Sequence, residues 1–109
     1  MKIELFYFDE CPSYERALKN LTDALSEERF DERVEMIPVL SEADAEAKRF
    51  LGSPSIRING VDIEGEEADQ RAYAYGCRVY VDGGKSVGWP SVEQLRRTLR
   101  ENLSSSSTL

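Results

Sequence analysis

Residues 2–18 read KIELFYFDECPSYERAL, and this stretch decides the fold class. Residues 2–8 are dense in aromatic and aliphatic side chains. From Leu5 onward the odd and the even positions are both apolar, which is typical of a central strand covered on both faces. From Tyr14 onward the apolar side chains recur at helical spacing, and Pro12 stands where a first helical residue tolerates proline. The stretch therefore predicts a buried strand that leads through Cys11 directly into an amphipathic helix.

The next segment predicts a second strand and a second helix. Residues 34–40 read VEMIPVL, a strand pattern in which Pro38 indicates an edge position or the end of the strand. Ser41 is a helix-capping residue, and we expect the helix that it caps to run through Leu51. Gly52 then ends this helix.

The second half of the chain combines short strands with a final helix. Residues 55–60, SIRING, alternate apolar and polar side chains and end in an Asn-Gly pair, a strong hairpin signal. Residues 64–75 fit neither period and are interpreted as an inserted loop with solvated acidic side chains. Residues 77–81, CRVYV, return to strand alternation. A capping pattern at Ser91 begins a last helix whose apolar stripe continues to Leu103.

These segments predict one α/β domain over residues 1–103. Their order, β-α-β-α-β-β-α, indicates a central mixed sheet of about four strands flanked by three helices, which is the element order of the thioredoxin fold. Residues 104–109, SSSSTL, offer nothing to bury, and we expect them to form a disordered tail.

The bulk composition narrows the function classes. With a formal net charge of −7, the 109 residues do not supply the clustered basic side chains that nucleic acids or an anionic membrane surface require. Two cysteines and no histidine exclude Ser-His and Cys-His catalysis and the usual zinc sites. The sequence shows no signal peptide and no apolar run near the ~20 residues of a spanning helix. We therefore expect a cytoplasmic protein without a bound cofactor.

Cys11 is the residue to which the sequence assigns chemistry. It follows a predicted central strand and precedes a helix N-terminus, whose free N–H groups and partial positive charge stabilise a thiolate. Asp9 and Glu10 oppose this effect, because nearby negative charge disfavours the thiolate. We expect a lowered but not extreme pKa for Cys11, against the alternative that its thiol only fills space in the core.

Residues 52–55, GSPS, form the second motif. In thioredoxin-like proteins a cis proline opens the third core strand beside the nucleophilic cysteine, and Pro54 stands in the matching place before a predicted strand. Ser53 would then offer backbone hydrogen bonds to an extended substrate. The alternative is an ordinary trans proline at the start of a strand.

The chain resembles thioredoxin-fold proteins in general and, more closely, a family of small bacterial thioredoxin-like proteins labelled alkylmercury-lyase-like. Three pieces carry this resemblance: residues 6–14 (FYFDECPSY), residues 50–64 (FLGSPSIRINGVDIE) and residues 75–80 (YGCRVY). The resemblance implies a thioredoxin-like fold and a thiol role for Cys11.

The sequence departs from thioredoxin-like oxidoreductases inside the motif itself. Those enzymes use C-x-x-C, whereas this chain has Cys-Pro-Ser-Tyr, with Tyr14 in the resolving position. Three alternatives remain: a monothiol mechanism with glutathione or another small thiol, resolution by Cys77, or no redox activity. Cys77 is equally well interpreted as a structural cysteine in a sheet. It resolves Cys11 only if the fold brings the two Cα atoms within the ~7 Å that a disulfide requires. Tyr14 either donates a hydrogen bond to a sulfur intermediate or packs half-buried.

Three function classes stay open. The first is a thiol–disulfide exchange enzyme with Cys11 as the nucleophile, whose partners are small thiols or the thiols and disulfides of proteins. The second is a non-catalytic module that binds a partner in a groove near Pro54. The third is a soft-metal binder in which Cys11 and Cys77 are thiolate ligands for a mercury- or copper-type ion. The residues expected to bind around the thiol are Pro12, Tyr14, Ser53 and Pro54.

Overall fold

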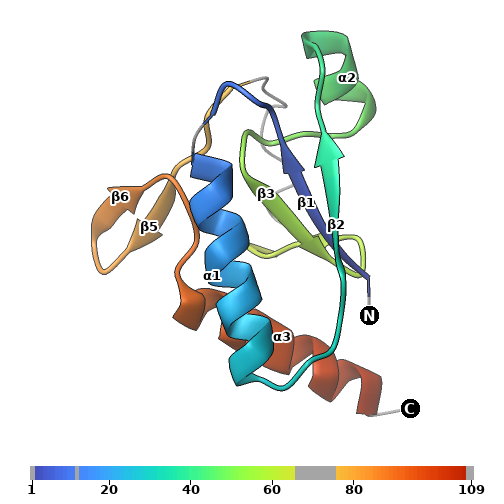
Figure 1. Ribbon diagram of the computed structural model, residues 1–109, viewed down its shortest axis with the longest axis vertical. Helices are drawn as coiled ribbons and strands as arrows, with labels where there is room; N and C mark the ends of the chain where they lie inside the picture. The colour runs from blue at the N-terminus through green and yellow to red at the C-terminus, as the bar shows by residue number, and fades with distance from the viewer. Residues whose placement is uncertain (1, 12, 66–75, 108–109) are drawn as a thin grey trace.

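The computed structural model describes residues 2–11, 13–65 and 76–107, and Figure 1 shows how its helices and strands are arranged. In chain order they are β1 (Ile3–Tyr7), α1 (Ser13–Glu27), β2 (Val34–Pro38), α2 (Glu42–Ala47), β3 (Ser55–Ile58), β4 (Val61–Asp62), β5 (Tyr80–Asp82), β6 (Lys85–Val87) and α3 (Val92–Ser107).

A four-stranded mixed sheet with the order β2-β1-β3-β4 forms the centre of the fold. β1 runs parallel to β2 and antiparallel to β3, with Leu5 opposite Met36 on one side and Ile56 on the other. β2 lies at an edge of this sheet, and Pro38 is its last residue, so the prediction from this proline is confirmed. The predicted α/β class, with a central mixed sheet of four strands and three helices, is therefore confirmed.

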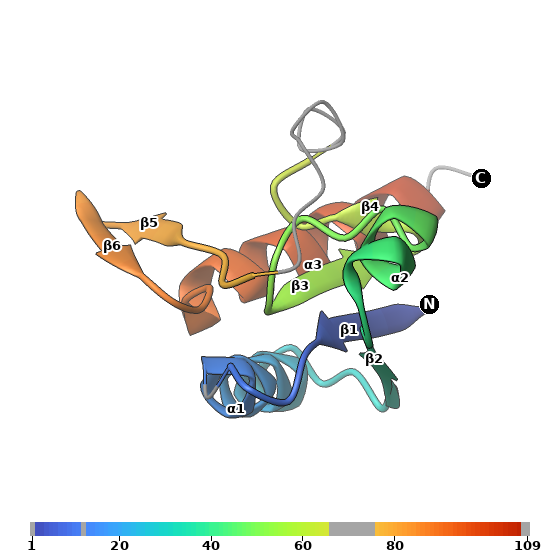
Figure 2. The same cartoon turned by 90° about the horizontal axis from the view of Figure 1, so that it is seen from above.

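Helices cover both faces of the sheet because β1 is apolar on both sides (Figure 2). Ile3 and Leu5 point into a core shared with α1 and α3, which includes Leu21 and Leu95. The opposite face carries Phe6, whose core cluster also contains Phe8, Cys11, Val39, Ala45 and Phe50, from β1, the loops and α2. Cys11 thus belongs to the smaller core, which it shares with Ala45 of α2.

The predicted hairpin at Asn59 and Gly60 is confirmed, with φ values of 55° and 84° that suit a tight type I′ connection. The second helix is shorter than the prediction, which extended it through Leu51. It ends at Ala47 because Arg49 takes a left-handed φ of 56° and the Phe50 N–H bonds back to the Ala45 carbonyl. This turn sends the Phe50 ring into the core.

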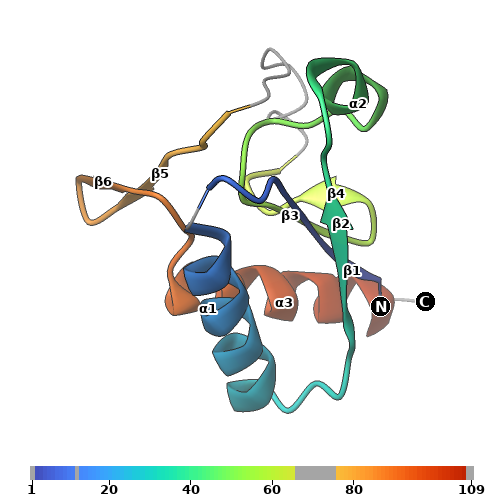
Figure 3. The same cartoon turned by 45° about the horizontal axis from the view of Figure 1, so that its top comes forward.

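β5 and β6 form a separate hairpin that projects away from the central sheet (Figure 3). The prediction of a strand over residues 77–81 is wrong in its start, since β5 begins at Tyr80. Cys77 instead makes an isolated parallel bridge to Ser53, and the Arg78 side chain turns into the interior. The predicted inserted loop lies outside the described residues from 66 to 75.

The C-terminal helix differs from the expected boundary. Ser91 caps it as predicted, its hydroxyl accepting the Gln94 N–H at 3.0 Å. The helix then continues through Ser107, whereas the expected tail was drawn from residue 104. The physical reason is that serine is only mildly unfavourable inside a helix that has already been nucleated. Residues 108–109 lie outside the described part of the chain.

Within the described ranges, no helix combines the length and the apolar character needed to span a bilayer.

Candidate functional site

The loop after β1 places Cys11 in the protein interior. Its backbone N–H donates to the Phe8 carbonyl at 3.1 Å, which closes a tight turn before α1 begins at Ser13. The Cys11 side chain is 0% exposed. The expected binding role of Pro12 lies outside the described residues.

Cys77 brings a second thiol to the same point. Its Sγ lies 3.3 Å from the Cys11 Sγ, although the two residues are 66 positions apart in the sequence. Both cysteines are free thiols, and Cys77 is exposed while Cys11 is buried. The sequence left open whether Cys77 reaches Cys11, and the structure brings them into contact.

Ser53, two residues before β3, contacts both segments that carry the thiols. Its N–H donates to the Gly76 carbonyl at 2.7 Å, and its own carbonyl accepts the Arg78 N–H at 2.9 Å. The same carbonyl lies 3.6 Å from the Cys11 Sγ, which donates to it. The Ser53–Pro54 peptide bond is cis. The backbone groups that we expected Ser53 to offer to an extended substrate are therefore already bonded to the chain's own residues.

The two thiols have opposite pKa shifts. Burial raises the pKa of Cys11, but hydrogen bonds from Cys77, from the Ser13 backbone N–H and from the Ser53 and Ser13 side chains outweigh it, so the pKa lies below its ordinary value of 9.0. The pKa of Cys77 is raised, because its thiol hydrogen bonds to Cys11, because it is partly desolvated and because it faces the Cys11 charge. The expected lowering at Cys11 is confirmed. Because the two shifts are opposite, the pair loses its first proton more readily at Cys11 than at Cys77.

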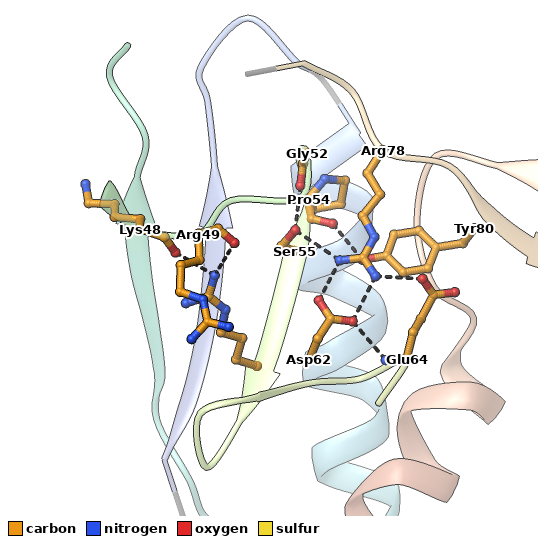
Figure 4. Close-up of polar contacts among 10 residues, drawn as sticks. Lys48, Arg49, Gly52, Pro54, Ser55, Asp62, Glu64, Arg78 and Tyr80 are labelled. Atoms are coloured by element: carbon orange, nitrogen blue, oxygen red, sulfur yellow. Dashed lines mark hydrogen bonds and ion pairs between the residues drawn. The ribbon is translucent and has the colours of Figure 1, made fainter. Parts of the chain in front are cut away.

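A buried ion cluster fixes the residue that follows Cys77 (Figure 4). Arg78 is 5% exposed, and its guanidinium donates to Asp62 at 2.6 and 2.8 Å and to Glu64 at 2.7 Å. A further bond of 3.0 Å runs to the Ser55 hydroxyl, which donates in turn to the Gly52 carbonyl. Acid pairing was one role that the sequence allowed for Arg78, but its partners and its burial were missed, since the acidic side chains from Glu64 onward were interpreted as solvated.

The sequence allowed two roles for Tyr14, hydrogen bonding to a sulfur intermediate or packing, and the structure shows packing. Its ring stacks on Tyr7, with centroids 4.5 Å apart, and it is half-buried against the larger core. Burial raises the pKa of Tyr14, with smaller contributions from the nearby charges of Glu15 and Asp9.

Two thiols are the soft ligands that the site offers to a metal ion. Among the residues that the structure describes, no group of three or more Cys, His, Asp or Glu side chains is arranged to hold a metal. In comparisons with known protein families, curated proteins and solved structures, nothing matches this chain.

Proposed function

We propose that this chain is a thioredoxin-like thiol–disulfide exchange protein in which Cys11 and Cys77 form the redox-active pair. The observation that carries the proposal is the 3.3 Å separation of their sulfur atoms. The thioredoxin-like fold is supported by the four-stranded mixed sheet with helices on both faces, and by a cysteine at the N-terminus of the first helix.

The pair compensates for the missing second cysteine of a C-x-x-C motif. A disulfide bond has an S–S length of about 2.05 Å, so the two sulfurs need to approach by only about 1.3 Å. When the bond forms, two thiols lose two protons and two electrons, and an external disulfide that accepts them becomes two thiols. The lowered pKa of Cys11 favours this chemistry, because the thiolate is both the nucleophile and the better leaving group.

The direct test is equilibration of the reduced protein with mixtures of reduced and oxidised glutathione. We expect both free thiols to disappear together, with the mass of the intact monomer decreasing by two hydrogen atoms. The variants Cys11→Ser and Cys77→Ser should each retain one thiol and form no intramolecular disulfide. Free thiols at both positions in strongly oxidising buffer would reject the function.

A second candidate function rests on the same contact. Two converging thiolates are suitable ligands for a soft ion of the copper(I) or mercury(II) type. Titration of the reduced protein with copper(I) distinguishes the candidates, since tight binding at a ratio of one ion per chain, together with no disulfide formation in glutathione buffer, would favour the metal role. A protein with two inert thiols would instead correspond to a non-catalytic binding module.

A further inference from the structure

We infer that external sulfur compounds exchange at Cys77, that Cys11 is the resolving thiol, and that the substrates are disulfides of low molecular mass rather than extended peptide segments. This inference rests on the proposed function and assigns the two cysteines their roles within it.

Access separates the two thiols. Disulfide exchange requires the incoming sulfur to approach the attacked or attacking sulfur directly, so that sulfur has to be reachable from solvent. Cys77 is exposed, whereas the Cys11 side chain is fully buried among Phe6, Phe8 and Phe50. A substrate sulfur therefore meets Cys77 first, although Cys11 has the lower pKa.

The backbone beside the thiol pair is closed to a peptide. An extended peptide that paired with Ser53 would need its N–H and C=O as partners, as in strand addition. The Gly76 carbonyl and the Arg78 N–H already use both groups, at 2.7 and 2.9 Å. The chain itself thus occupies the position of an extended substrate, with Cys77 at its centre.

The occupying segment is held too firmly to be displaced. Releasing Arg78 would break its bonds to Asp62 and Glu64 and leave uncompensated charge in the interior, which is strongly unfavourable. Tyr80 lies three residues beyond Cys77, and its hydroxyl adds a 2.7 Å hydrogen bond to the Pro54 carbonyl. Gly52 packs so closely that a Cβ placed there would lie 2.9 Å from the Arg78 Cβ. Arg78 is accordingly a positioning residue for Cys77.

The chemistry balances with a small disulfide as the oxidant. The Cys11 thiolate accepts the proton of the Cys77 thiol as Cys77 attacks one sulfur of the disulfide, and the first small thiolate leaves with a proton from solvent. Cys11 then attacks the Cys77 sulfur of the mixed disulfide, and its proton passes to the second small thiolate, which leaves as a thiol. The substrate is reduced to two thiols, and the protein is oxidised to the Cys11–Cys77 disulfide.

The reverse reaction depends on the same difference in exposure and pKa between Cys77 and Cys11. A small thiolate attacks the exposed Cys77 sulfur of the protein disulfide, and Cys11 leaves as the thiolate. Hydrogen bonds from Ser13 and Ser53 stabilise this leaving group. A leaving thiol of lower pKa departs faster, so attack at Cys77 is favoured chemically as well as sterically.

The test compares single-cysteine variants treated with glutathione disulfide, with mass spectrometry of the intact protein. In Cys11→Ser, we expect a stable glutathione adduct on Cys77, because the resolving thiol is absent. In Cys77→Ser, we expect the loss of adduct formation in the native protein, with modification of Cys11 only after unfolding in guanidinium. Cys77→Ala is a second replacement at position 77 and should give the same result as Cys77→Ser. A circular dichroism spectrum of each variant verifies that the comparison uses folded proteins.

Substrate class is tested with the reduced wild-type protein, by following its oxidation by glutathione disulfide and by insulin, whose disulfides lie within a protein. We expect oxidation by the small disulfide and no measurable reduction of insulin. A faster adduct on Cys11 than on Cys77, or a preference for insulin, would overturn the inference and leave the proposed function standing, provided that the wild type still forms its internal disulfide. Absence of that disulfide would instead reject the proposed function.

Discussion

The hydroxyl of Tyr80 donates a 2.7 Å hydrogen bond to the carbonyl oxygen of Pro54, which links the first residue of β5 to the residue just before β3. Removal of this donor in Tyr80→Phe leaves a buried carbonyl without its partner and should lower the unfolding free energy by about 1–3 kcal/mol. Urea denaturation measures this change. Val81→Ala is a matched control on the same strand, because Val81 is 69% exposed and its truncation should cost little.

The same substitution reports on how the thiol pair is held. Tyr80 helps to keep Cys77 next to Cys11, so Tyr80→Phe should also make the disulfide easier to reduce, with a less negative reduction potential in glutathione buffer. A variant that loses stability but keeps the wild-type potential would show that this hydrogen bond has no part in positioning Cys77.

The buried ion cluster predicts unequal effects for its two carboxylates. The Asp62 side chain is 3% exposed and that of Glu64 is 22% exposed, although both bond to Arg78. Asp62→Asn should lower the unfolding free energy by on the order of 3 kcal/mol, because among the described residues Glu64 is then the one counter-charge that contacts Arg78. Glu64→Gln should cost about 1 kcal/mol or less, as is typical of a partly exposed pair. Equal losses in urea denaturation would contradict this interpretation of the cluster.

The hydrogen bond between the two sulfur atoms predicts coupled titration of the two thiols. Cys77→Ala removes the hydrogen-bond donor that stabilises the Cys11 thiolate, so the pKa of Cys11 should rise. Cys11→Ala removes the neighbour that raises the pKa of Cys77, which should therefore fall. The ultraviolet absorbance of the thiolate as a function of pH measures both values. Ser13→Ala is the control, since it keeps the backbone N–H that bonds to Cys11 and should cause a smaller rise.

Acid stability should depend on Glu28, which lies far from the thiols. Hydrogen bonds from Arg100 and Arg96 lower the pKa of Glu28 from an ordinary value of 4.5 to about 2. Because the folded-state pKa is depressed, this contribution to stability is fully present above pH 4.5 and is lost as the pH falls toward 2. Glu28→Gln should lose stability at neutral pH and show a flatter decline in this interval. Thermal unfolding at a series of pH values checks both effects against Glu35→Gln, an exposed control.

Local patterns in the sequence predict the parts of the fold that depend on neighbouring residues. The strand before Cys11 and the Asn59-Gly60 hairpin are fixed by periodicity and turn chemistry within a few positions, and both are present. The helix after Ser41 ended early, because a turn that buries Phe50 was favoured over further helical residues.

The candidate site was less accessible to sequence reasoning, because its contacts join distant segments. Nothing in the residues around Cys77 indicates that it bridges to Ser53, since this contact joins two segments that are 24 positions apart in the sequence. The pairing of Arg78 with Asp62 was hidden for a related reason. A short run of acidic residues after a hairpin has the composition of a surface loop, and only the folded chain brings a buried cation to it.

The separation of Cys11 and Cys77 along the chain gives oxidation a mechanical consequence. A bond between residues 66 positions apart would close a covalent ring that contains α1, α2 and three of the four strands of the central sheet. Such a ring reduces the freedom of the unfolded chain and corresponds to about 4 kcal/mol of extra stability in the chain-entropy view. The folding equilibrium and the thiol equilibrium are then thermodynamically linked, so that a more oxidising environment would also make the protein harder to unfold.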